Sequence, residues 1–430
     1  MAEKTEARES EGWALSRRAF LQGALSLAGG AVVRPSLAAA TPRLERLELV
    51  TDQAATGSGG NNWGGHQTRI VRTPRGVFTA YTVSGTGDLA RRWRLSERVG
   101  NDWRIVVPGE PAGREPMNLL AGTRGQMYVI AWPDGLPTLW SASGTALFHP
   151  EPIPGDWQKT DWPYGAAGIN SHGDIFVLQS LGEKPGELRW ASRLAQASQW
   201  RFHVTATDYR FCYTYVLPGP AGALALTATR DVPWQSLGYE KPAGAFGYVF
   251  NAVGSWYTPN AAGEALRMTL VREETPTPSF PLVECNNAQG DTYLDTRGRL
   301  HILYTLRGAS THDYQKTRHA VLTGSTILKD VELPFEYGHY SRIIQDAGGR
   351  FYVFSAAEGG SELLVYPALS EDGTALGAPT RLDLQGNKVT YFGLALAAPR
   401  CGVPLANFVD GVFPSGQGEK LVYFRVRLSS

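Results

Sequence analysis

Hydrophobic residues in this chain gather in short runs, and turns that end in glycine separate one run from the next. Around Gly349 the chain reads as the end of one strand, a tight turn at 346–349 and a second strand at 351–354. The aromatic and β-branched residues of these runs suit half-buried pleated surfaces. The same order of strand, turn and strand recurs at six other turns: 73–76, 122–125, 170–173, 220–222, 295–298 and 399–402.

The turn glycines follow one another at a nearly constant distance. Residues 76, 125, 173, 222, 298, 349 and 402 differ successively by 49, 48, 49, 76, 51 and 53. A period of roughly 40–50 residues with about four strands per unit is typical of a β-propeller. If the turn joins the first strand (A) to the second (B), strand B falls at 77–81, 127–130, 175–178, 224–226, 300–304, 351–354 and 404–408. We therefore predict an all-β, seven-bladed β-propeller.

The two ends of this repeat predict how the ring closes. The last unit offers strands A (391–397), B and C (421–428), but no strand D follows. Residues 43–50 alternate like a strand and precede the first A strand without a partner of their own. Pairing the two would complete the last blade and cover a bare sheet edge.

The fourth spacing is longer than the others and predicts an insertion in blade 4. It begins around residue 233, between strands B and C, and extends to about 262. In a propeller the B–C and D–A connections share one face with the starts of the A strands. The insertion should therefore overhang the mouth of the central channel, and long loops of this kind are often functional.

The first 40 residues differ in character from the repeat. Residues 16–22 read Ser-Arg-Arg-Ala-Phe-Leu-Gln, a mildly apolar run follows at 23–33, and small residues lie at 37–40. This pattern resembles a bacterial twin-arginine export signal. A membrane anchor is the alternative, but the run is short and rich in glycine. We expect residues 1–40 to be a signal peptide, 41–430 a single propeller domain, and the product to be periplasmic or extracellular.

Composition narrows the partners. Lys+Arg (41) nearly balances Asp+Glu (40), so the whole chain has no electrostatic attraction to nucleic acid or acidic lipid. No cysteine lies directly after the apolar run at 23–33, which argues against a lipid anchor at that site. The chain has three cysteines, Cys212, Cys285 and Cys401. An odd number in an exported protein leaves at least one of them unpaired within the chain. A Cys212–Cys285 bridge and buried free thiols are both possible, and free thiols are favoured.

Counting back from each turn glycine places polar residues together at the channel mouth. Ten residues before the glycine, units one and six carry His66 and His339. Core strands would show Val or Ile at such positions, so we expect one pocket around the axis. The position nine before holds Gln67, Tyr164, Tyr213, Gln289 and Tyr340, and the position seven before holds Arg69, Asn118, Tyr215, Asp291 and Arg342.

Each of these residues also has a structural interpretation. A histidine on an inner strand is commonly a hydrogen-bonded structural group, and Tyr213 and Tyr215 could wedge between blades. Arg69 and Arg342 could tie neighbouring blades to carboxylates such as Asp291. The matched positions of His and Arg in two units are what favour a functional site.

Four other histidines are expected on different faces or strands of the propeller. His312 falls in a B–C loop on the mouth face and is a further candidate. His319 should lie on strand C, away from the axis, and His203 on an outer strand. His172 and Cys401 lie in A–B turns on the opposite face.

Familiar catalytic motifs are absent from the sequence. There is no Gly-x-Ser-x-Gly elbow, phosphate loop, Cys-x-x-Cys pair or His-x-x-x-His signature. The Asp-box of sialidases is only faintly suggested at 197–200 and 101–103, and the arginine triad and Tyr–Glu pair of a sialidase cannot be assembled.

An exported propeller with weak Asp-box likeness and His, Tyr and Arg at its mouth resembles the BNR-4-type carbohydrate-active propellers, a group that includes ulvan-type lyases and rhamnosyl-glucuronate-cleaving relatives. The resemblance implies three kinds of role around a uronic acid. The base would be His66 or His339, the acid Tyr213, Tyr215 or Tyr340, and the groups neutralising the carboxylate Arg69 or Arg342 with Gln67.

Further substrate contacts are expected around these groups. Aromatic faces suit sugar rings, and polar side chains suit their hydroxyls. The candidates are Trp63, Tyr164, Trp234, Asn287, Asp291 and His312. No metal is required once arginine binds the carboxylate, and a calcium ion would leave no mark in this sequence. No other cofactor is expected.

The leading prediction is an exported polysaccharide lyase that cleaves a uronate-containing glycan by β-elimination. A glycoside hydrolase on the same pocket would need two carboxylates, for which Asp291 and Asp313 are the nearest candidates. A propeller that only binds glycan or protein is the third possibility. The expected partner is an acidic polysaccharide or oligosaccharide, with no nucleic acid and no membrane anchor. The glycan and the oligomeric state are not predicted.

Overall fold

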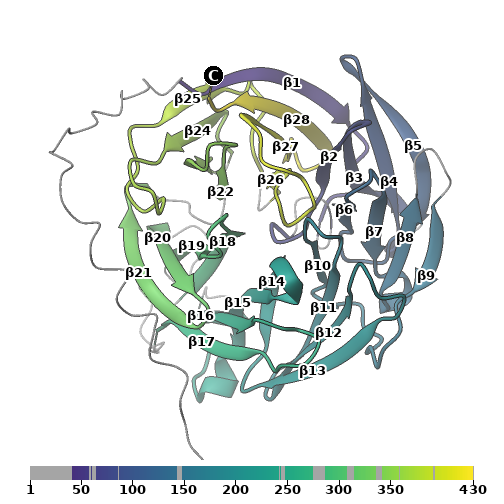
Figure 1. Cartoon of the computed structure of the whole chain (residues 1–430), viewed down its shortest axis with the longest axis vertical. Helices are drawn as coiled ribbons and strands as arrows, with labels where there is room; N and C mark the ends of the chain where they lie inside the picture. The colour runs from purple at the N-terminus through teal and green to yellow at the C-terminus, as the bar shows by residue number, and fades with distance from the viewer. Residues whose placement is uncertain are drawn as a thin grey trace, which may run out of the picture. The chain divides into compact units, whose positions relative to one another are not determined.

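The computed structural model describes residues 41–57, 60, 64–85, 87–142, 148–241, 243, 247–274, 286–307, 314–335, 341–357, 359–390 and 393–429. Within these residues the strands form seven antiparallel sheets of four strands each, arranged around one axis (Figure 1). Only short 3-10 turns accompany them in the described part of the chain. The predicted seven-bladed β-propeller is confirmed.

The first four blades follow the chain in order. They are blade 1, β2 (Ile70–Thr73), β3 (Gly76–Gly85), β4 (Gly87–Val99) and β5 (Asp102–Pro111); blade 2, β6 (Asn118–Ala121), β7 (Met127–Ala131), β8 (Thr138–Ala142) and β9 (His149–Pro152); blade 3, β10 (Ala166–Ile169), β11 (Ile175–Gly182), β12 (Gly186–Arg193) and β13 (Arg201–Thr207); blade 4, β14 (Phe211–Pro218), β15 (Leu224–Pro233), β16 (Tyr248–Thr258) and β17 (Arg267–Glu273).

The last three blades continue the pattern, and the final one borrows the first strand of the chain. They are blade 5, β18 (Asn286–Leu294), β19 (Leu300–Arg307), β20 (Tyr314–Thr323) and β21 (Thr326–Leu333); blade 6, β22 (Arg342–Gln345), β23 (Phe351–Ser355), β24 (Glu362–Pro367) and β25 (Thr380–Asp383); blade 7, β26 (Ala395–Leu396), β27 (Phe408–Ser415), β28 (Lys420–Arg427) and β1 (Arg43–Thr51).

The ring closes as predicted. Strand β1 pairs antiparallel with β28, with Leu47 opposite Phe424. The pair covers the edge that β28 would otherwise expose, which removes a site for edge-to-edge association. Val422, Phe424 and Val426 of β28 are fully buried in the core between blades, so this closure is also a hydrophobic one.

In several blades the first side chain of the A–B turn holds the turn. In the turn of blade 6, Asp346 Oδ1 accepts hydrogen bonds from the backbone N–H groups of Gly348 (2.9 Å) and Arg350 (3.0 Å). Gly349 then takes a φ of +82°, which favours glycine. Asn170 and Asp295 repeat the Asp346 arrangement in blades 3 and 5. Because the turn is fixed locally, its glycine marks the same point in successive blades, and the glycine spacing therefore follows the blade repeat.

Blade 7 departs from this pattern, and here the predicted strand B was wrong. Strand β27 begins at Phe408, whereas 404–408 was expected to be the strand. Pro404 has no N–H for a ladder, and its carbonyl instead accepts a bond from Arg72 Nη2 (3.0 Å). The preceding turn, 399–402, folds inward, so that Ile169 N–H donates to Arg400 O (2.9 Å) and Ala121 N–H to Cys401 O (2.8 Å). We call residues 399–402 the plug turn.

The region predicted as an insertion contains both irregular and regular structure. After β15, Trp234–Leu237 form a 3-10 turn, and Tyr248–Thr258 then continue the blade as β16. The insertion boundaries at about 233–262 remain a prediction.

Residues 1–40, which carry the predicted export signal, lie outside the described residues, as does Cys285. Among the described residues, none of the helical segments has the length and hydrophobicity needed to cross a membrane. Cys212 and Cys401 are both buried free thiols, in line with the favoured alternative for the cysteines.

Candidate functional site

His66 lies at the centre of a buried cluster built from inner strands of several blades. It belongs to the segment that leads into β2, where Gly64 takes a φ of +72° and its carbonyl accepts a bond from Gln67 N–H (3.1 Å). The His66 side chain is only 1% exposed. Its ring meets Tyr213 and Tyr215 edge-on, with centroids 5.7 and 6.4 Å away.

Three arginines surround this histidine from blades 1, 6 and 7. Arg69 and Arg342 are fully buried, and Arg342 Nη1 donates to Gly290 O (2.7 Å). Arg400 Nη1 donates to the backbone carbonyl of His66 (2.6 Å). Burial and the nearby Arg342 charge lower the pKa of Arg69 to about 9. A lowered guanidinium pKa indicates a site where positive charge is concentrated.

The same environment keeps His66 neutral. Burial, followed by the charges of Arg400 and Arg69, lowers the pKa of His66 to about 3, although the Gly165 backbone partly opposes this. Neither ring nitrogen makes a hydrogen bond of normal geometry with a described group. A buried polar group without a partner costs roughly 1–3 kcal/mol, and such groups in native proteins often have a functional reason.

Tyr164 and Tyr213 occupy the same position in blades 3 and 4 and share an unusual backbone. Their φ angles are +44° and +56°, a region that bulky residues rarely adopt. Their rings meet edge-on at 5.6 Å, and β14 carries a register shift between Cys212 and Tyr215. Backbone strain of this kind clusters at binding and catalytic sites. Burial raises the pKa of Tyr213 well above its usual value, so its hydroxyl stays protonated.

Glu115 belongs to the cluster and was missed by the sequence analysis. Its Oε2 accepts a bond from Gln67 Nε2 (3.1 Å), and its Oε1 has no partner among the described residues. Burial raises the pKa of Glu115 to about 7. It lies ten residues before Gly125, the offset that marks His66 before Gly76, so the glycine spacing could have found it.

Tyr215 and Asp291 make contacts that join blades. The Tyr215 hydroxyl donates to Gly290 O (2.6 Å), and Asp291 Oδ2 accepts from Ile343 N–H (3.0 Å). Burial raises the pKa of Tyr215 to about 12, and burial also raises that of Asp291. Tyr215 and Asp291 therefore border the cluster and also connect neighbouring blades. This is the structural interpretation that the sequence left open.

An aromatic surface adjoins the cluster at blades 2 and 3. The rings of Trp162 and Tyr164 stack with centroids 6.5 Å apart, and the Arg114 guanidinium lies over Trp162. All three side chains are half-buried. Trp234 was also expected to offer a face to sugar, and that role stays a prediction. It is 1% exposed and packs with Val249 in a small hydrophobic cluster.

The side chains of five other candidates are not among those that the structure describes. Trp63, His312, His339 and Tyr340 lie outside the described residues, and Asn287 is described only by its backbone pairing with Leu306 in blade 5. The predicted meeting of His66 with His339 therefore stays a prediction. No group of three or more His, Cys, Asp or Glu side chains suited to a metal ion occurs among the residues described.

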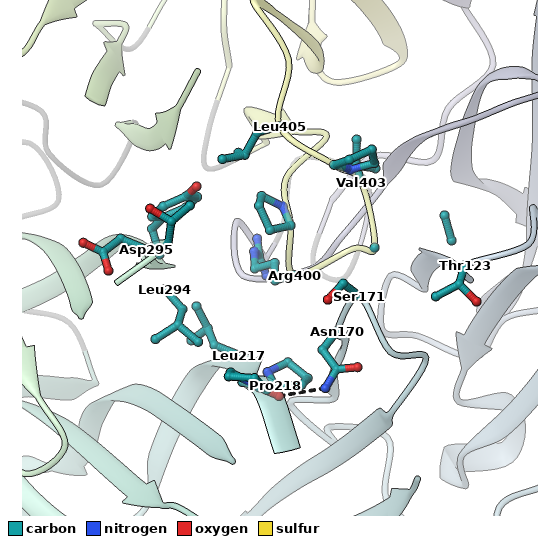
Figure 2. A pocket seen from close by; sticks show the side chains of 18 of the residues that line it. Thr123, Asn170, Ser171, Leu217, Pro218, Leu294, Asp295, Arg400, Val403 and Leu405 are labelled. Atoms are coloured by element: carbon teal, nitrogen blue, oxygen red, sulfur yellow. Dashed lines mark hydrogen bonds between the residues drawn. The ribbon is translucent and has the colours of Figure 1, made fainter. Parts of the chain in front are cut away.

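The opposite end of the axis holds a separate cavity. Its volume is about 760 Å³, and the A–B turns of blades 1 to 5 and the plug turn line it. Figure 2 shows Arg400 near the middle of these turns, with Leu217 and Leu294 on one side and Val403 and Leu405 on the other. Arg400 is thus shared, because it lines this cavity and also bonds to His66.

No known protein-family model matches this chain. No curated protein is significantly similar in sequence. Many solved structures are similar in fold, and three of them have TM-scores of 0.50 or more. The polysaccharide lyase Uly1 has a TM-score of 0.57 at 12% identity, covering 90% of this chain and 100% of that one. An ulvan lyase of family PL25, bound to -[GlcA(1-4)Rha3S]-, has a TM-score of 0.53 at 11% identity, covering 88% and 95%. A Dyadobacter fermentans protein of unknown function has a TM-score of 0.50 at 10% identity, covering 90% and 100%. At such identities these matches show a shared fold.

Proposed function

We propose that this protein is an exported polysaccharide lyase that cleaves a uronic-acid-containing glycan by β-elimination. The observation that carries the proposal is the His66 cluster: a buried neutral imidazole that faces a protonated tyrosine and three guanidinium groups. The fold shared with two polysaccharide lyases over most of the chain supports it.

The groups suit the steps of the reaction. The neutral imidazole of His66 accepts the proton next to the uronate carboxylate, and the C–O bond to the leaving sugar then breaks. Arg69 and Arg342 stabilise the enolate charge that develops on the carboxylate. The Tyr213 hydroxyl donates its proton to the leaving oxygen. The product carries a new carbon–carbon double bond, so protons and electrons balance without a metal or a redox partner.

Substrate charge would tune the base. An anionic carboxylate bound beside the arginines offsets their effect on His66, so the pKa of the ring rises towards a value suited to proton abstraction. His66 and Arg69 are each 1% exposed. Substrate binding therefore requires the packing around His66 to open.

The deciding experiment is incubation of the purified protein, lacking residues 1–40, with a panel of acidic polysaccharides. Elimination produces an unsaturated uronate, which is followed by its ultraviolet absorbance. We expect absorbance growth that survives a chelator and is lost in His66→Gln. His172→Gln is the matched control, because this exposed turn histidine is remote from the proposed chemistry. Absorbance growth that persists in His66→Gln would refute the assignment of the base.

A glycoside hydrolase is the second candidate, favoured by Glu115. A carboxyl with a pKa of about 7 is suited to act as a general acid, and Asp291 would be the second carboxylate. New reducing ends without ultraviolet absorbance, abolished in Glu115→Gln, would establish hydrolysis. Glycan binding without products would favour a purely binding propeller.

Export is part of the proposal and has its own test. The twin arginines Arg17 and Arg18 are expected to direct the chain out of the cytoplasm to the periplasm or beyond. Replacing both by lysine should leave the protein in the cytoplasmic fraction, whereas unchanged fractionation would contradict this route.

A further inference from the structure

We propose that Arg400 is a positioning residue, which reaches His66 and Tyr215 from the plug turn and holds them in place for the elimination reaction. This inference rests on the proposed function. In the sequence alone, Arg400 lies in a turn that looks equivalent to the other A–B turns.

The backbone of the plug turn is fixed on the far side of the axis. It comes from blade 7, yet its carbonyls accept hydrogen bonds from the inner strands of blades 2 and 3, and Cys401 forms a parallel bridge with Ile169. Gly402 has a φ of +81°, and a Cβ on it would lie 1.8 Å from the Ala121 carbonyl oxygen. Only glycine fits this close approach. The turn is thus held rigidly across the channel.

The Arg400 side chain extends from this base into the cluster. Its Nη1 donates to His66 O at 2.6 Å, and its guanidinium carbon lies 4.8 Å from the centre of the Tyr215 ring. One planar group therefore fixes the backbone of the proposed base and stacks on a tyrosine that borders it. Arginine suits both tasks, because its fork donates in fixed directions and its plane stacks on aromatic rings.

Arg400 differs in this respect from Arg69 and Arg342. Arg69 Nη2 donates to Gly64 O (3.3 Å), within its own blade, and Arg342 donates to Gly290 O and to its neighbour Ser341. Arg342 thus ties blade 6 to blade 5, whereas Arg400 connects blade 7 to blade 1 and bonds to the backbone of His66 itself. Its loss should therefore misplace the base without removing a group that binds the substrate carboxylate.

The kinetic test compares Arg400→Gln with Arg400→Lys. Misplacing a catalytic group by about 1 Å can cost on the order of 100-fold, so we expect kcat of Arg400→Gln to fall by about 10- to 100-fold with KM changed less than about threefold. Arg400→Lys should recover part of kcat, since it restores a charged donor. Arg124→Gln is the matched control, because Arg124 is an exposed arginine in the A–B turn of blade 2. An unchanged kcat in Arg400→Gln would overturn the proposal.

A second measurement reads the geometry without any activity. The groups that face His66 are Arg69, Arg342, Arg400, Tyr213 and Tyr215, with Glu115 reached through Gln67. In NMR spectra of histidine-labelled protein, the His66 ring signal is identified by its loss in His66→Phe. Removing the Arg400 charge should shift this signal at neutral pH and move its titration to higher pH, while Arg124→Gln leaves it unchanged.

The two measurements separate the failure of each idea. If no glycan is cleaved but the His66 signal shifts as expected, the lyase proposal fails and the positioning contact stands. If glycan is cleaved but Arg400→Gln changes neither kcat nor the His66 signal, the positioning proposal fails alone. If Arg400→Gln does not fold, Arg400→Lys decides the matter: it should lower kcat and shift the His66 signal, and wild-type behaviour in both would overturn the proposal.

Discussion

Two buried histidine sites in this propeller look alike by burial and differ in how their nitrogens are satisfied. In blade 5, His301 Nδ1 and His319 Nε2 share a hydrogen bond of 3.0 Å, and His301 Nε2 donates to Asp295 Oδ2 at 3.2 Å. Asp295 is held in turn by Arg299 Nε (2.7 Å). Among the residues that the structure describes, His66 has no such chain of side-chain partners, and arginines face it where blade 5 supplies a carboxylate.

The comparison shows that a lowered pKa alone does not mark a functional histidine. Burial lowers the pKa of His319 to about 3, the same value as for His66, and burial also lowers that of His301. Of the four ring nitrogens of His301 and His319, only Nδ1 of His319 is left without a normal hydrogen bond to a described group, and such a network is what a structural site requires. What distinguishes His66 is an imidazole that bonds to no described side chain and lies in a concentration of positive charge.

The largest expected difference is catalytic. Replacing either histidine by phenylalanine keeps a ring and removes the nitrogens. General-base catalysis contributes roughly 10²–10⁴-fold, so the cleavage rate of His66→Phe should fall by that factor. His301→Phe should retain the wild-type rate per folded molecule, within about threefold. Initial rates of absorbance growth provide the measurement, and equal losses in both variants would remove the distinction between the two sites.

The next effect concerns the arginines of the two regions. Removing a group that stabilises developing negative charge costs about 10²–10³-fold in rate, so Arg69→Met should lower kcat/KM by that amount. Arg299→Met, which removes the partner of Asp295 in blade 5, should leave kcat/KM unchanged. Steady-state kinetics on the same glycan test this pair. Full activity of Arg69→Met would show that its charge is not used.

The two histidine replacements should affect stability in the opposite order to their effect on the cleavage rate. His301→Phe leaves His319 Nε2 without its partner, while Asp295 keeps Arg299, and an unsatisfied buried group costs roughly 1–3 kcal/mol. The free energy of unfolding in urea should therefore fall by at least that amount. His66→Phe breaks no hydrogen bond to another described side chain and should change the free energy of unfolding by less than about 1 kcal/mol. A large loss in His66→Phe would make His66 a structural residue.

The smallest expected effect is on the pH dependence of stability. The pKa of His66 is about 3 in the folded protein and 6.5 in the unfolded chain. Between these two pH values the unfolded chain binds more protons, so stability falls as the pH is lowered. Glu115 has a folded pKa of about 7 against 4.5, so its stabilising contribution is present below 4.5 and lost as pH rises through 7. The two oppose each other between 4.5 and 6.5.

Single variants should uncover this cancellation. Glu115→Gln should make unfolding free energy fall more steeply on acidification between pH 6.5 and 4.5, by at most about 1.4 kcal/mol per pH unit. His66→Phe should make the fall shallower. Urea titrations at several pH values read both slopes, and identical slopes in the three proteins would contradict the opposed shifts.

The sequence predicted the fold well because each turn is specified locally. Residues such as Asp346 and Gly349 set their hairpin with their own side chain and backbone, so spacing alone revealed the blades. The closing strand followed from one unpaired strand and one missing partner. The plug turn was not predictable in this way, because its Arg400 and Cys401 carbonyls bond to strands more than two hundred residues earlier, Ile169 and Ala121.

The shared offset from the turn correctly placed several predicted residues near one another, while their roles stay predictions. His66, Arg69, Tyr213 and Tyr164 do lie in or beside one buried cluster. The burial of Trp234 was not predictable, because an aromatic residue in a long loop can either be exposed or pack beneath that loop, as Trp234 does against Val249. Arg400 was out of reach, since its role depends on a chain reversal that only the tertiary structure displays.

The pairing of β1 with β28 has a consequence for the order of assembly. Arg43 and Arg427 are partners across 427 − 43 = 384 residues, so this contact is among the most distant in sequence that the chain can make. Contacts of such separation form slowly, because the loop they close has to be brought together first. Blade 7 contributes the plug turn as well as the closing sheet. We therefore expect His66 to acquire its Arg400 contact only in the last stage of folding, and a chain stalled before residue 400 to hold six blades and no completed site.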